Sequence, residues 1–507
     1  MSNLLDIIKT MNFKEVSQLF LDKKPSFDLA TDKQSSNTIR TSVGYQAQAI
    51  NEYNVEAHDI FDTTVRPDKT IKKDSLETDA NGVPILIAST VPVARIGIPM
   101  QKLIVKRRVG FMLSDPVKTE ATYASESDAE KKLEALVERI QNDNKMDYRN
   151  KEIARRMMSE LEVAELWYFV ENKEPDDVLK GKYTLRMKIL SPDLGDKLYP
   201  LFDDSGDMVA FARGYKLRDG KVEIEHFDVY TSEFEYKYIN KDNTWTLDTE
   251  VQSMTSEGLK AVNPIPSAVK KIMVIYHTQP RPEWADVQTM ISRFEEVTSN
   301  HADMNDYFGS PILTVAGEIL GFAQKGEQGK VLQLANEAKA NYLALNSPPE
   351  SIKMELDNLE KLIYALSQTP NISFEQLMSI GGQLSGIALK LMFLDAHMAV
   401  KDKEEIFGIG LQRRLNLLKA SIGAVIDASL SSVVRTLQLK PKITPYLPQN
   451  VTEMIENITV AKTGGIISTE TAVGQNPLVA DAETEMERLA NDKTEELASQ
   501  EGQGQFE

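Results

Sequence analysis

The apolar residues of this chain change their spacing twice, and this change constrains the fold more than any other feature of the sequence. Between residues 126 and 170 they recur three and four positions apart, which is the period of an amphipathic helix. Across residues 183–278 they alternate with polar residues, as in strands with one buried face. From residue 284 the helical spacing returns. The pattern predicts an α+β fold with an antiparallel sheet between helical segments.

Turn residues divide the alternating region into hairpins. Asp219-Gly220 lies between two alternating runs, which is a strong signal of a β-hairpin, and a second turn is predicted at residues 203–206. We therefore expect a sheet of roughly five or six strands. Its last strand is the buried run within KKIMVIYHTQPRP, residues 270–282.

Helices are predicted on both sides of the sheet. KKLEALVERI (131–140) and EIARRMMSELEVAELWYFV (152–170) precede it and have apolar residues at helical spacing. Two more are predicted over 284–308 and 350–369, and a compact α/β unit of short strands and glycine turns lies between them.

The longest helix is predicted over residues 387–429, where it would reach about 65 Å at the usual rise per residue. Gly408 and Gly410 are expected to kink it. A strand, a helix and an acidic tail follow, and the tail is either an exposed helix or disordered. At the other end of the chain, a short helix is expected over residues 3–11, and Pro99 marks a point where a helix begins or breaks.

Composition excludes several classes of site. The chain has 507 residues, a formal charge of −18 and no cysteine, so disulfides, thiol nucleophiles and cysteine metal sites are absent. None of its five histidines is three to five residues from another, and no helical metal pair exists. No apolar run approaches the ~20 residues that span a bilayer. The N-terminus lacks a secretory pattern, and the absence of cysteine fits synthesis in a reducing cytosol. We also expect no cofactor and no metal.

Enzyme motifs are also absent. In GFAQKGEQGK (321–330), Gly321 and Gly326 have the spacing of a phosphate-binding loop, but Glu327 stands where the lysine belongs, and a carboxylate there would repel a triphosphate. The run is better explained as a hairpin turn. No serine elbow occurs, and we expect no catalytic residue. A short basic cluster, residues 106–108, is interpreted as a surface stripe, and contact with phosphate or a partner is the less favoured alternative.

A polar, glycine-bearing segment passes directly into the longest predicted helix at ISFEQLMSIGGQLSGIALKLMFL, residues 372–394. Its glycines permit bending and positive φ. Its uncharged side chains suit weak, exchangeable hydrogen bonds to phosphates or bases, while the alternative is a mobile connector between helices. The residues concerned are Ser373, Gln376, Ser379, Gly381, Gly382, Gln383 and Ser385.

Four stretches, taken in order, resemble the portal proteins of tailed double-stranded DNA bacteriophages, and most closely the portal family of long-tailed phages that infect Gram-positive bacteria. These stretches are RIGIPMQKLIVKRRVGFMLSDPV (95–117), FDVYTSEFEYKYI (227–239), QLSGIALKLMF (383–393) and GGIISTETAVGQNPLVADAETEMERL (464–489). The last two are the most specific. In the first, Asp115 stands in the place of the family's glycine.

The resemblance implies an elongated subunit of a ring, usually of twelve copies, with an α/β wing, a two-helix stem, a small α/β clip, a long kinked helix and a helical crown. The implied parts are an N-terminal arm (1–80), the wing of helices and antiparallel sheet (81–282), a stem helix (283–309), the clip (310–349), a second stem helix (350–369), a tunnel loop (370–386), the long wing helix with a return strand (387–450), and the crown with the acidic tail (451–507).

It also implies a function. The ring would be a channel at one capsid vertex, through which double-stranded DNA is packaged and ejected, and a docking platform for the terminase motor and the head-completion or tail adaptor. Major capsid and scaffolding proteins would be further partners. The protein would belong to the virion, be assembled in the host cytoplasm, and have no enzymatic activity and no membrane contact. The alternative is a head–tail adaptor or another structural protein of the virion.

Site residues follow from the same resemblance. The polar and glycine residues of the tunnel loop would face DNA. Lys353 and Lys361 would either line the channel or form salt bridges between subunits. The clip residues that would dock the motor or adaptor are Glu318, Lys325, Glu327 and Lys330.

Overall fold

A computed structural model describes most of the chain, and its residues form two compact units. One unit contains Met1–Thr369 and Val400–Thr444, and the other contains Pro370–Ala399 and Pro445–Glu507. The described residues are 12–22, 42–78, 84–176, 178–220, 222–249, 252–255, 258–308, 312–316, 319–321, 333–334, 339–343, 349–371, 391, 393–446, 451–479 and 481–503.

A six-stranded antiparallel sheet is the largest sheet of the first unit. Its strand order is β10-β9-β8-β7-β6, with β13 paired to β9. The Asp219-Gly220 hairpin is confirmed, because Asp219 pairs with Val222 and Gly220 has a positive φ of 60°. The strands are β6 (Lys197–Phe202), β7 (Met208–Asp219), β8 (Val222–Thr231), β9 (Phe234–Lys241), β10 (Thr244–Leu247) and β13 (Ile265–Pro266).

A second, three-stranded sheet corrects two predictions. Its order is β14-β4-β5, where β4 is Glu162–Glu171, β5 is Tyr183–Leu190 and β14 is Val274–Thr278. The predicted antiparallel sheet of five or six strands is present, but the prediction that β5 and β14 belong to it is wrong, since both pair with β4. The helix predicted to continue to residue 170 is also wrong.

The helix before β4 ends because Leu161 adopts a left-handed conformation, with φ 69°. The next residues favour a strand, since Trp167, Tyr168 and Phe169 are aromatic. The alternation that would reveal this strand is hidden, because the carboxylates of Glu162 and Glu165 are buried together with the apolar residues around them.

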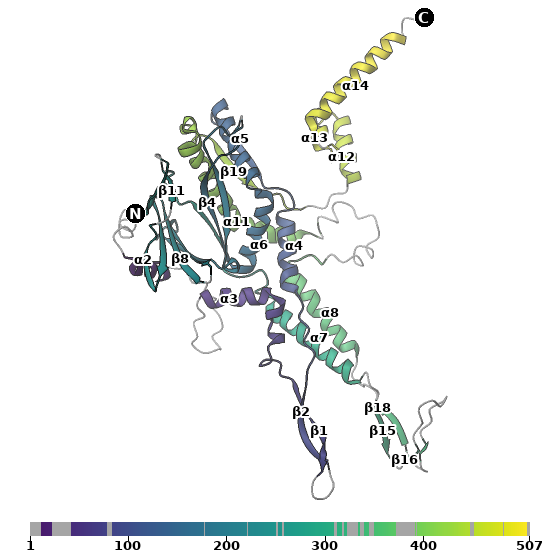
Figure 1. The fold of residues 1–507 in the computed structure, drawn as a ribbon. Coiled ribbons are helices and arrows are strands. Elements are labelled where there is room, and N and C mark those ends of the chain that lie inside the picture. Colours follow the sequence, from purple (N-terminus) through teal and green to yellow (C-terminus); the bar gives the residue numbers. More distant parts are fainter. Residues whose placement is uncertain are drawn as a thin grey trace. The chain divides into compact units, whose positions relative to one another are not determined.

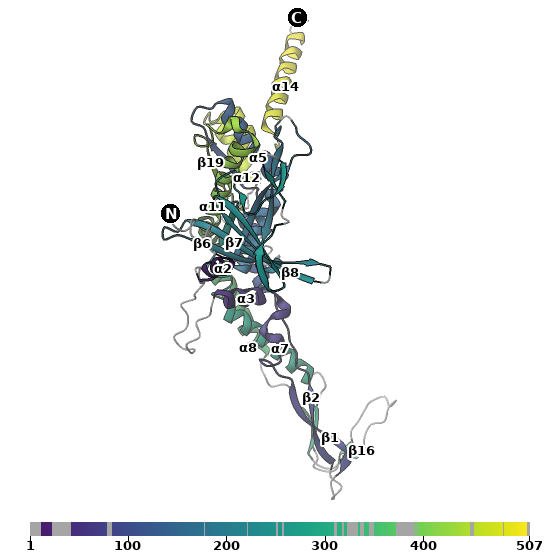
Figure 2. The ribbon, with the colours of Figure 1, turned by 60° about the vertical axis from the view of Figure 1, so that its left-hand side comes forward.

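Opposite faces of the six-stranded sheet pack against different elements. Helix α2 (Phe13–Asp22) covers one face with the buried Val16 and Phe20 (Figure 2). On the other face, Phe211 and Tyr230 pack against Val274 and neighbouring residues of the three-stranded sheet. The helix expected over residues 3–11 lies outside the described residues.

The remaining helices and strands of the first unit begin and end as follows. Its helices are α3 (Ser42–Tyr53), α4 (Met100–Met112), α5 (Asp128–Asp143), α6 (Met146–Glu160), α7 (Gln288–Phe308) and α8 (Pro349–Leu366). Its smaller antiparallel pairs are β1 (Lys69–Thr78) with β2 (Pro84–Val91), β3 (Lys118–Thr122) with β19 (Gln438–Lys442), β11 (Gln252–Thr255) with β12 (Gly258–Ala261), β15 (Ile312–Ala316) with β18 (Lys339–Leu343), and β16 (Ile319–Gly321) with β17 (Gln333–Leu334).

Several predictions about these elements are confirmed. Helix α4 begins directly after Pro99, and α7 and α8 form where the spacing predicts helices. Of the α/β unit predicted between α7 and α8, the short strands are confirmed as β15 to β18, whereas its described residues contain no helix.

Helix α11 (Leu394–Ser421) is the longest helix among the described residues, and it ends earlier than the predicted residue 429. Its 28 residues span about 42 Å, and a π-helical turn, Ile422–Ile426, follows it. The helix continues without interruption through Gly408 and Gly410, the positions where a kink is predicted. Gly410 instead permits close packing, since a Cβ atom there would lie 2.2 Å from the ring of His277.

A buried ionic network holds α11 against both α6 and the three-stranded sheet. The guanidinium of Arg414 donates to both carboxylate oxygens of Glu165 on β4, at 2.5 and 2.8 Å, and to Asn150 on α6 at 2.7 Å. His277 on β14 and Trp167 bond the same carboxylate, at 2.6 and 3.0 Å. Although burial raises the pKa of Glu165, the charge of Arg414 and the hydrogen bond from His277 hold it well below its usual range.

In the second unit, the described residues from 451 onward form three helices. They are α12 (Val451–Thr463), α13 (Thr469–Gln475) and α14 (Ala482–Gln503). Ser468 caps α13 by accepting a hydrogen bond from the Thr471 amide. Of the two predicted states of the acidic tail, the helix forms over residues 482–503. Throughout the described ranges, no helix is long and apolar enough to cross a bilayer.

The packing of α11 predicts opposite effects for two neighbouring glycines. Gly410→Ala should destabilise the protein by about 1–3 kcal/mol, because the new methyl group would overlap the buried ring of His277. The matched control is Gly408→Ala, where no atom lies within 4 Å of the added Cβ and helix propensity should stabilise the protein by about 0.5–1 kcal/mol. Chemical denaturation of both variants measures the two effects. Equal effects of the two substitutions would contradict this packing.

Candidate functional site

Helices α7 and α8 lie side by side as an antiparallel pair, and the strands β15–β18 lie between them in the chain (Figure 1). The buried side chains of Ile291 and Val297 on α7 and of Ile363 on α8 contribute to the core of this region. An ion pair between Arg293 and Glu355, at 2.9 Å, also joins the two helices.

The outer face of α8 has a charged row. Lys353, Asp357 and Lys361 are all exposed and follow one another at intervals of four residues. At 3.6 residues per turn, the two lysines are about 80° apart around the helix axis. They therefore share one side of α8 with a carboxylate between them, and the row is only weakly basic.

An apolar row lies beside the charged one. Met354, Leu362 and Leu366 are 64%, 46% and 54% exposed, and Met354 and Leu362 line a shallow groove on the same helix. Exposed apolar residues that gather on one face mark a surface that contacts another protein.

Helix α7 is bound to the preceding chain by a ladder of hydrogen bonds between its side chains and an extended backbone. The amides of Ala94, Ile96 and Ile98 donate to Asp303, Ser299 and Glu295, at 2.7, 3.0 and 2.7 Å. Every second residue of the extended segment is thus paired with every fourth residue of the helix.

The distance between successive hydrogen-bonding residues is nearly the same on the extended segment and on the helix. Two extended residues advance about 6.6 Å and four helical residues about 6.0 Å, so the three hydrogen bonds remain in register. The side chains of α7 take the place of a neighbouring strand for residues 94–98. Because these residues lead from β2 into α4, the ladder fixes both elements to the helix pair.

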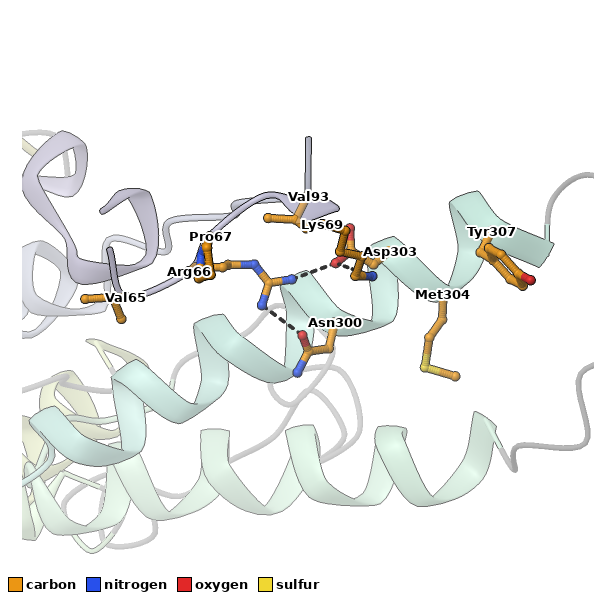
Figure 3. Close-up of a pocket in the computed structure, with 9 residues that line it drawn as sticks. All are labelled: Val65, Arg66, Pro67, Lys69, Val93, Asn300, Asp303, Met304 and Tyr307. Carbon is orange, nitrogen blue, oxygen red and sulfur yellow. Dashed lines mark hydrogen bonds and ion pairs between the residues drawn. The ribbon is translucent and has the colours of Figure 1, made fainter. Parts of the chain in front are cut away.

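The far end of the ladder forms a pocket of about 580 Å³ at the base of the β1–β2 hairpin (Figure 3). Arg66 donates to Asn300 and to Asp303, each at 2.8 Å, and Lys69 lies 3.4 Å from the same carboxylate. Although burial raises the pKa of Asp303, the Ala94 amide and these cations lower it overall. Met304 also lines the pocket.

The near end of the ladder holds a buried histidine. His58 Nδ1 lies 2.6 Å from Glu295, and its Nε2 lies 2.8 Å from the carbonyl oxygen of Glu52. Burial lowers the pKa of His58, but the hydrogen bond and the charge of Glu295 outweigh it and raise the pKa overall. Trp284 donates to the Glu52 carboxylate at 2.7 Å, which ties the segment before α7 to α3.

A second anchor lies where α8 ends. Arg108 on α4 donates to the carbonyl oxygen of Ser367 at 2.7 Å and lies 3.3 Å from Glu283. Lys403 on α11 contacts Glu283 at 2.6 Å. The chain is therefore fixed just before residue 370 and again just after residue 400.

This anchor corrects the basic stripe predicted at residues 106–108. Arg108 is only 8% exposed and is neutralised by Glu283, so it is not free to contact phosphate. Arg107 lies over the ring of Tyr364 on α8, 5.1 Å from its centre. Arg107 and Arg108 therefore join α4 to α8 and its end, and of the three residues only Lys106 is fully exposed.

Comparison with known proteins identifies the family. A family model described as "Phage portal protein, SPP1 Gp6-like" matches residues 43–498. The chain belongs to this family of phage portal proteins. The resemblance predicted from the sequence motifs is therefore confirmed.

Two individual proteins are similar to this portal-family chain. The portal protein of Bacillus phage SPP1 is 25% identical over 159 residues, which are 31% of this chain and 30% of that protein. The aligned region thus spans less than a third of the SPP1 protein. A solved structure described as the neck of an empty GTA particle, computed with C6 symmetry, has a TM-score of 0.39 and 10% identity, and it covers 74% of this chain and 88% of that one.

Of the site residues expected of a portal protein, the described part of the chain includes two. Lys353 and Lys361 lie on the exposed face of α8. The predicted loop residues and clip residues lie outside the described residues. They are Ser373, Gln376, Ser379, Gly381, Gly382, Gln383, Ser385, Glu318, Lys325, Glu327 and Lys330.

The ion pair of His58 predicts a pH-dependent contribution to stability. A raised folded-state pKa stabilises the protein fully below the unfolded value of 6.5, and this stabilisation is lost as the pH rises through the folded value. His58→Gln should therefore lower the melting temperature more at about pH 6 than at about pH 9. Circular dichroism at both pH values measures this, and His301→Gln is the control on α7. An equal loss at both pH values for His58→Gln would contradict the assignment.

Proposed function

We propose that this chain is the subunit of a ring that forms the channel at one capsid vertex, through which double-stranded DNA enters and leaves the phage head. The observation that carries this proposal is the portal family model, which matches residues 43–498. The ring would consist of about twelve copies, as the family resemblance implies, and would belong to the virion after assembly in the host cytoplasm.

In this proposal, α7 and α8 are the stem of the channel. The weakly basic row on α8 suits a wall past which DNA moves, because strong clusters of lysine and arginine would hold the phosphates. The net charge of −18 per subunit would also keep DNA from binding tightly, since an acidic wall repels DNA. Lys353 and Lys361 would then be weak contacts with DNA, or partners of acidic groups on a neighbouring subunit.

The segment around residues 370–386 would be the loop that surrounds the DNA. Its ends are supported by the anchors at Arg108 and Lys403. Fixed ends and central glycines allow each copy to move while the ring stays closed. The polar residues from Ser373 to Ser385 would contact the passing duplex.

The strands β15–β18 and the segments between them would be the clip. Glu318, Lys325, Glu327 and Lys330 would dock the terminase motor and then the head-completion or tail adaptor, and charge-reversed variants in a binding assay test this assignment. Capsid and scaffolding proteins would contact other parts of the ring. The role is structural and not enzymatic. No observation on the described residues favours the alternative of a head–tail adaptor.

The apolar row on α8 predicts where subunits meet. Met354→Glu with Leu362→Glu should weaken ring formation by at least about 100-fold, because two apolar contacts worth about 1.5–3 kcal/mol each would be lost and charge introduced. The matched control is Leu217→Glu with Val222→Glu, two apolar residues that are 52% and 63% exposed on the β7–β8 hairpin. Size-exclusion chromatography with light scattering, and negative-stain images of perforated rings, measure assembly. A wild-type chain that never forms rings would overturn the proposal.

The loop glycines predict a separate effect on DNA passage. Gly381→Pro with Gly382→Pro should leave rings intact and reduce the DNA packaged per head, because proline fixes φ and stiffens the loop. Ser379→Ala is the control that leaves the glycines in place. Normal packaging by the proline variant would remove the hinge from the proposed mechanism.

A further inference from the structure

A second pocket lies between the two larger sheets, away from the helix pair. It has a volume of about 440 Å³, and its walls come from β4, from β7 to β9 and from the segment that contains β13. Its lining is largely aromatic and apolar: Trp167, Phe169, Tyr215, Tyr230, Phe234 and Pro266. Pockets of this size with a few polar groups among apolar walls are typical of small-molecule sites.

The floor of the pocket has a row of charged residues on neighbouring strands. Arg213 on β7 pairs in register with Asp228 on β8, and Asp228 pairs with Lys237 on β9. Both cations already have carboxylate partners, since Arg213 contacts Asp196 at 2.6 Å and Lys237 contacts Glu235 at 3.2 Å. An anionic ligand would have to compete with these carboxylates.

Asp228 is the carboxylate of this row with one oxygen atom that lacks a hydrogen-bond partner. Its side chain is 2% exposed, and its Oδ2 accepts hydrogen bonds from Tyr215 and Tyr230, each at 3.2 Å. Its Oδ1 is buried and has no hydrogen-bond partner among the described residues. Burial raises the pKa of Asp228, while the charges of Lys237 and Arg213 oppose this rise. A buried acceptor left unsatisfied is costly, so the site is built to receive a donor.

The residues around Asp228 indicate which kind of hydrogen-bond donor the pocket would bind. Within the described part of the chain, no group of three or more histidine or carboxylate side chains is placed to hold a metal ion. Asp196 pairs with Arg213 and Glu235 pairs with Lys237, whereas Asp228 has no such ion pair, and the charges of Lys188, Lys237 and Arg213 act on it only from a greater distance. A positive charge in contact with Asp228 would therefore complement it when it is ionised. Aromatic faces also attract cations.

We propose that this pocket binds an alkylammonium ion, whose NH₃⁺ group donates to Oδ1 of Asp228 and whose carbon chain lies among the aromatic side chains. The site is independent of the proposed channel. If the ring-assembly experiments disprove the proposed channel, the proposal of this binding site still stands. Disproof of the binding site likewise leaves the proposed channel standing.

Titration of the purified full-length chain with 1-aminobutane tests the proposal by calorimetry, with tryptophan fluorescence as a second signal, since Trp167 lines the pocket. We expect saturable binding of one ligand per chain. The uncharged analogue 1-butanol should bind at least about 10-fold more weakly, because it cannot form the ion pair. Absence of saturable binding, which would mean that the pocket holds only water, would overturn the proposal, as would equal binding of the alcohol.

Two substitutions should change the affinity in opposite directions. Asp228→Asn removes the charge and should weaken binding about 10-fold or more, whereas Lys237→Met frees Glu235 and should strengthen it about threefold or more. The matched control is Asp204→Asn, an exposed carboxylate in the β6–β7 turn, which should leave the affinity unchanged. If Asp228→Asn does not fold, the Lys237→Met result decides alone. Unchanged affinity in Lys237→Met, or in a folded Asp228→Asn, would contradict the assignment.

Discussion

The ladder between α7 and residues 94–98 is the interaction on which the arrangement of the helix pair depends. An extended segment that is not part of a sheet leaves its amides without partners, and buried amides without partners are costly. Here Glu295, Ser299 and Asp303 supply the acceptors, and their spacing along α7 matches the spacing of every second amide in the extended segment. One helix face thus replaces a strand, and the chain on both sides of the segment is held against α7.

Buried charges perform the corresponding task around α11. Arg414 joins this helix to β4 and α6, while Arg108 and Lys403 meet at Glu283 near the end of α8. Each cation has a carboxylate partner, which offsets the cost of taking it out of water. These contacts fix the chain before and after residues 370–399. In the proposed portal ring, fixed ends of this kind are what allow the intervening loop to move without loosening the subunit.

The sequence predicts the elements whose signals are local. The turn at Asp219-Gly220, the start of α4 after Pro99 and the helices α7 and α8 each follow from nearby residues. Strand β4 is mispredicted because Glu165, although charged, is buried against Arg414, about 250 positions away in the chain. The helical spacing of apolar residues that continues through residues 161–170 holds no signal of this long-range ion pair.

Sequence alone also cannot reveal the candidate site. Asp303 lies 209 positions from Ala94, and nothing near either residue marks their contact. Arg108 resembles its basic neighbours in the sequence, and only its contact with Glu283 distinguishes it. The family is recognised because its motifs are short and local, whereas the roles of the loop and clip residues rest on the resemblance and on the tests proposed for them.

Hydrogen exchange of the backbone amides in residues 94–98 tests the ladder most directly. Slow and fast exchange should alternate along the segment: the amides of Ala94, Ile96 and Ile98 exchange slowly, because each donates to a side chain of α7. The amides of Arg95 and Gly97, which have no such acceptor on α7 among the described residues, exchange faster. Uniformly fast exchange along the segment, as in an exposed loop, would contradict the account.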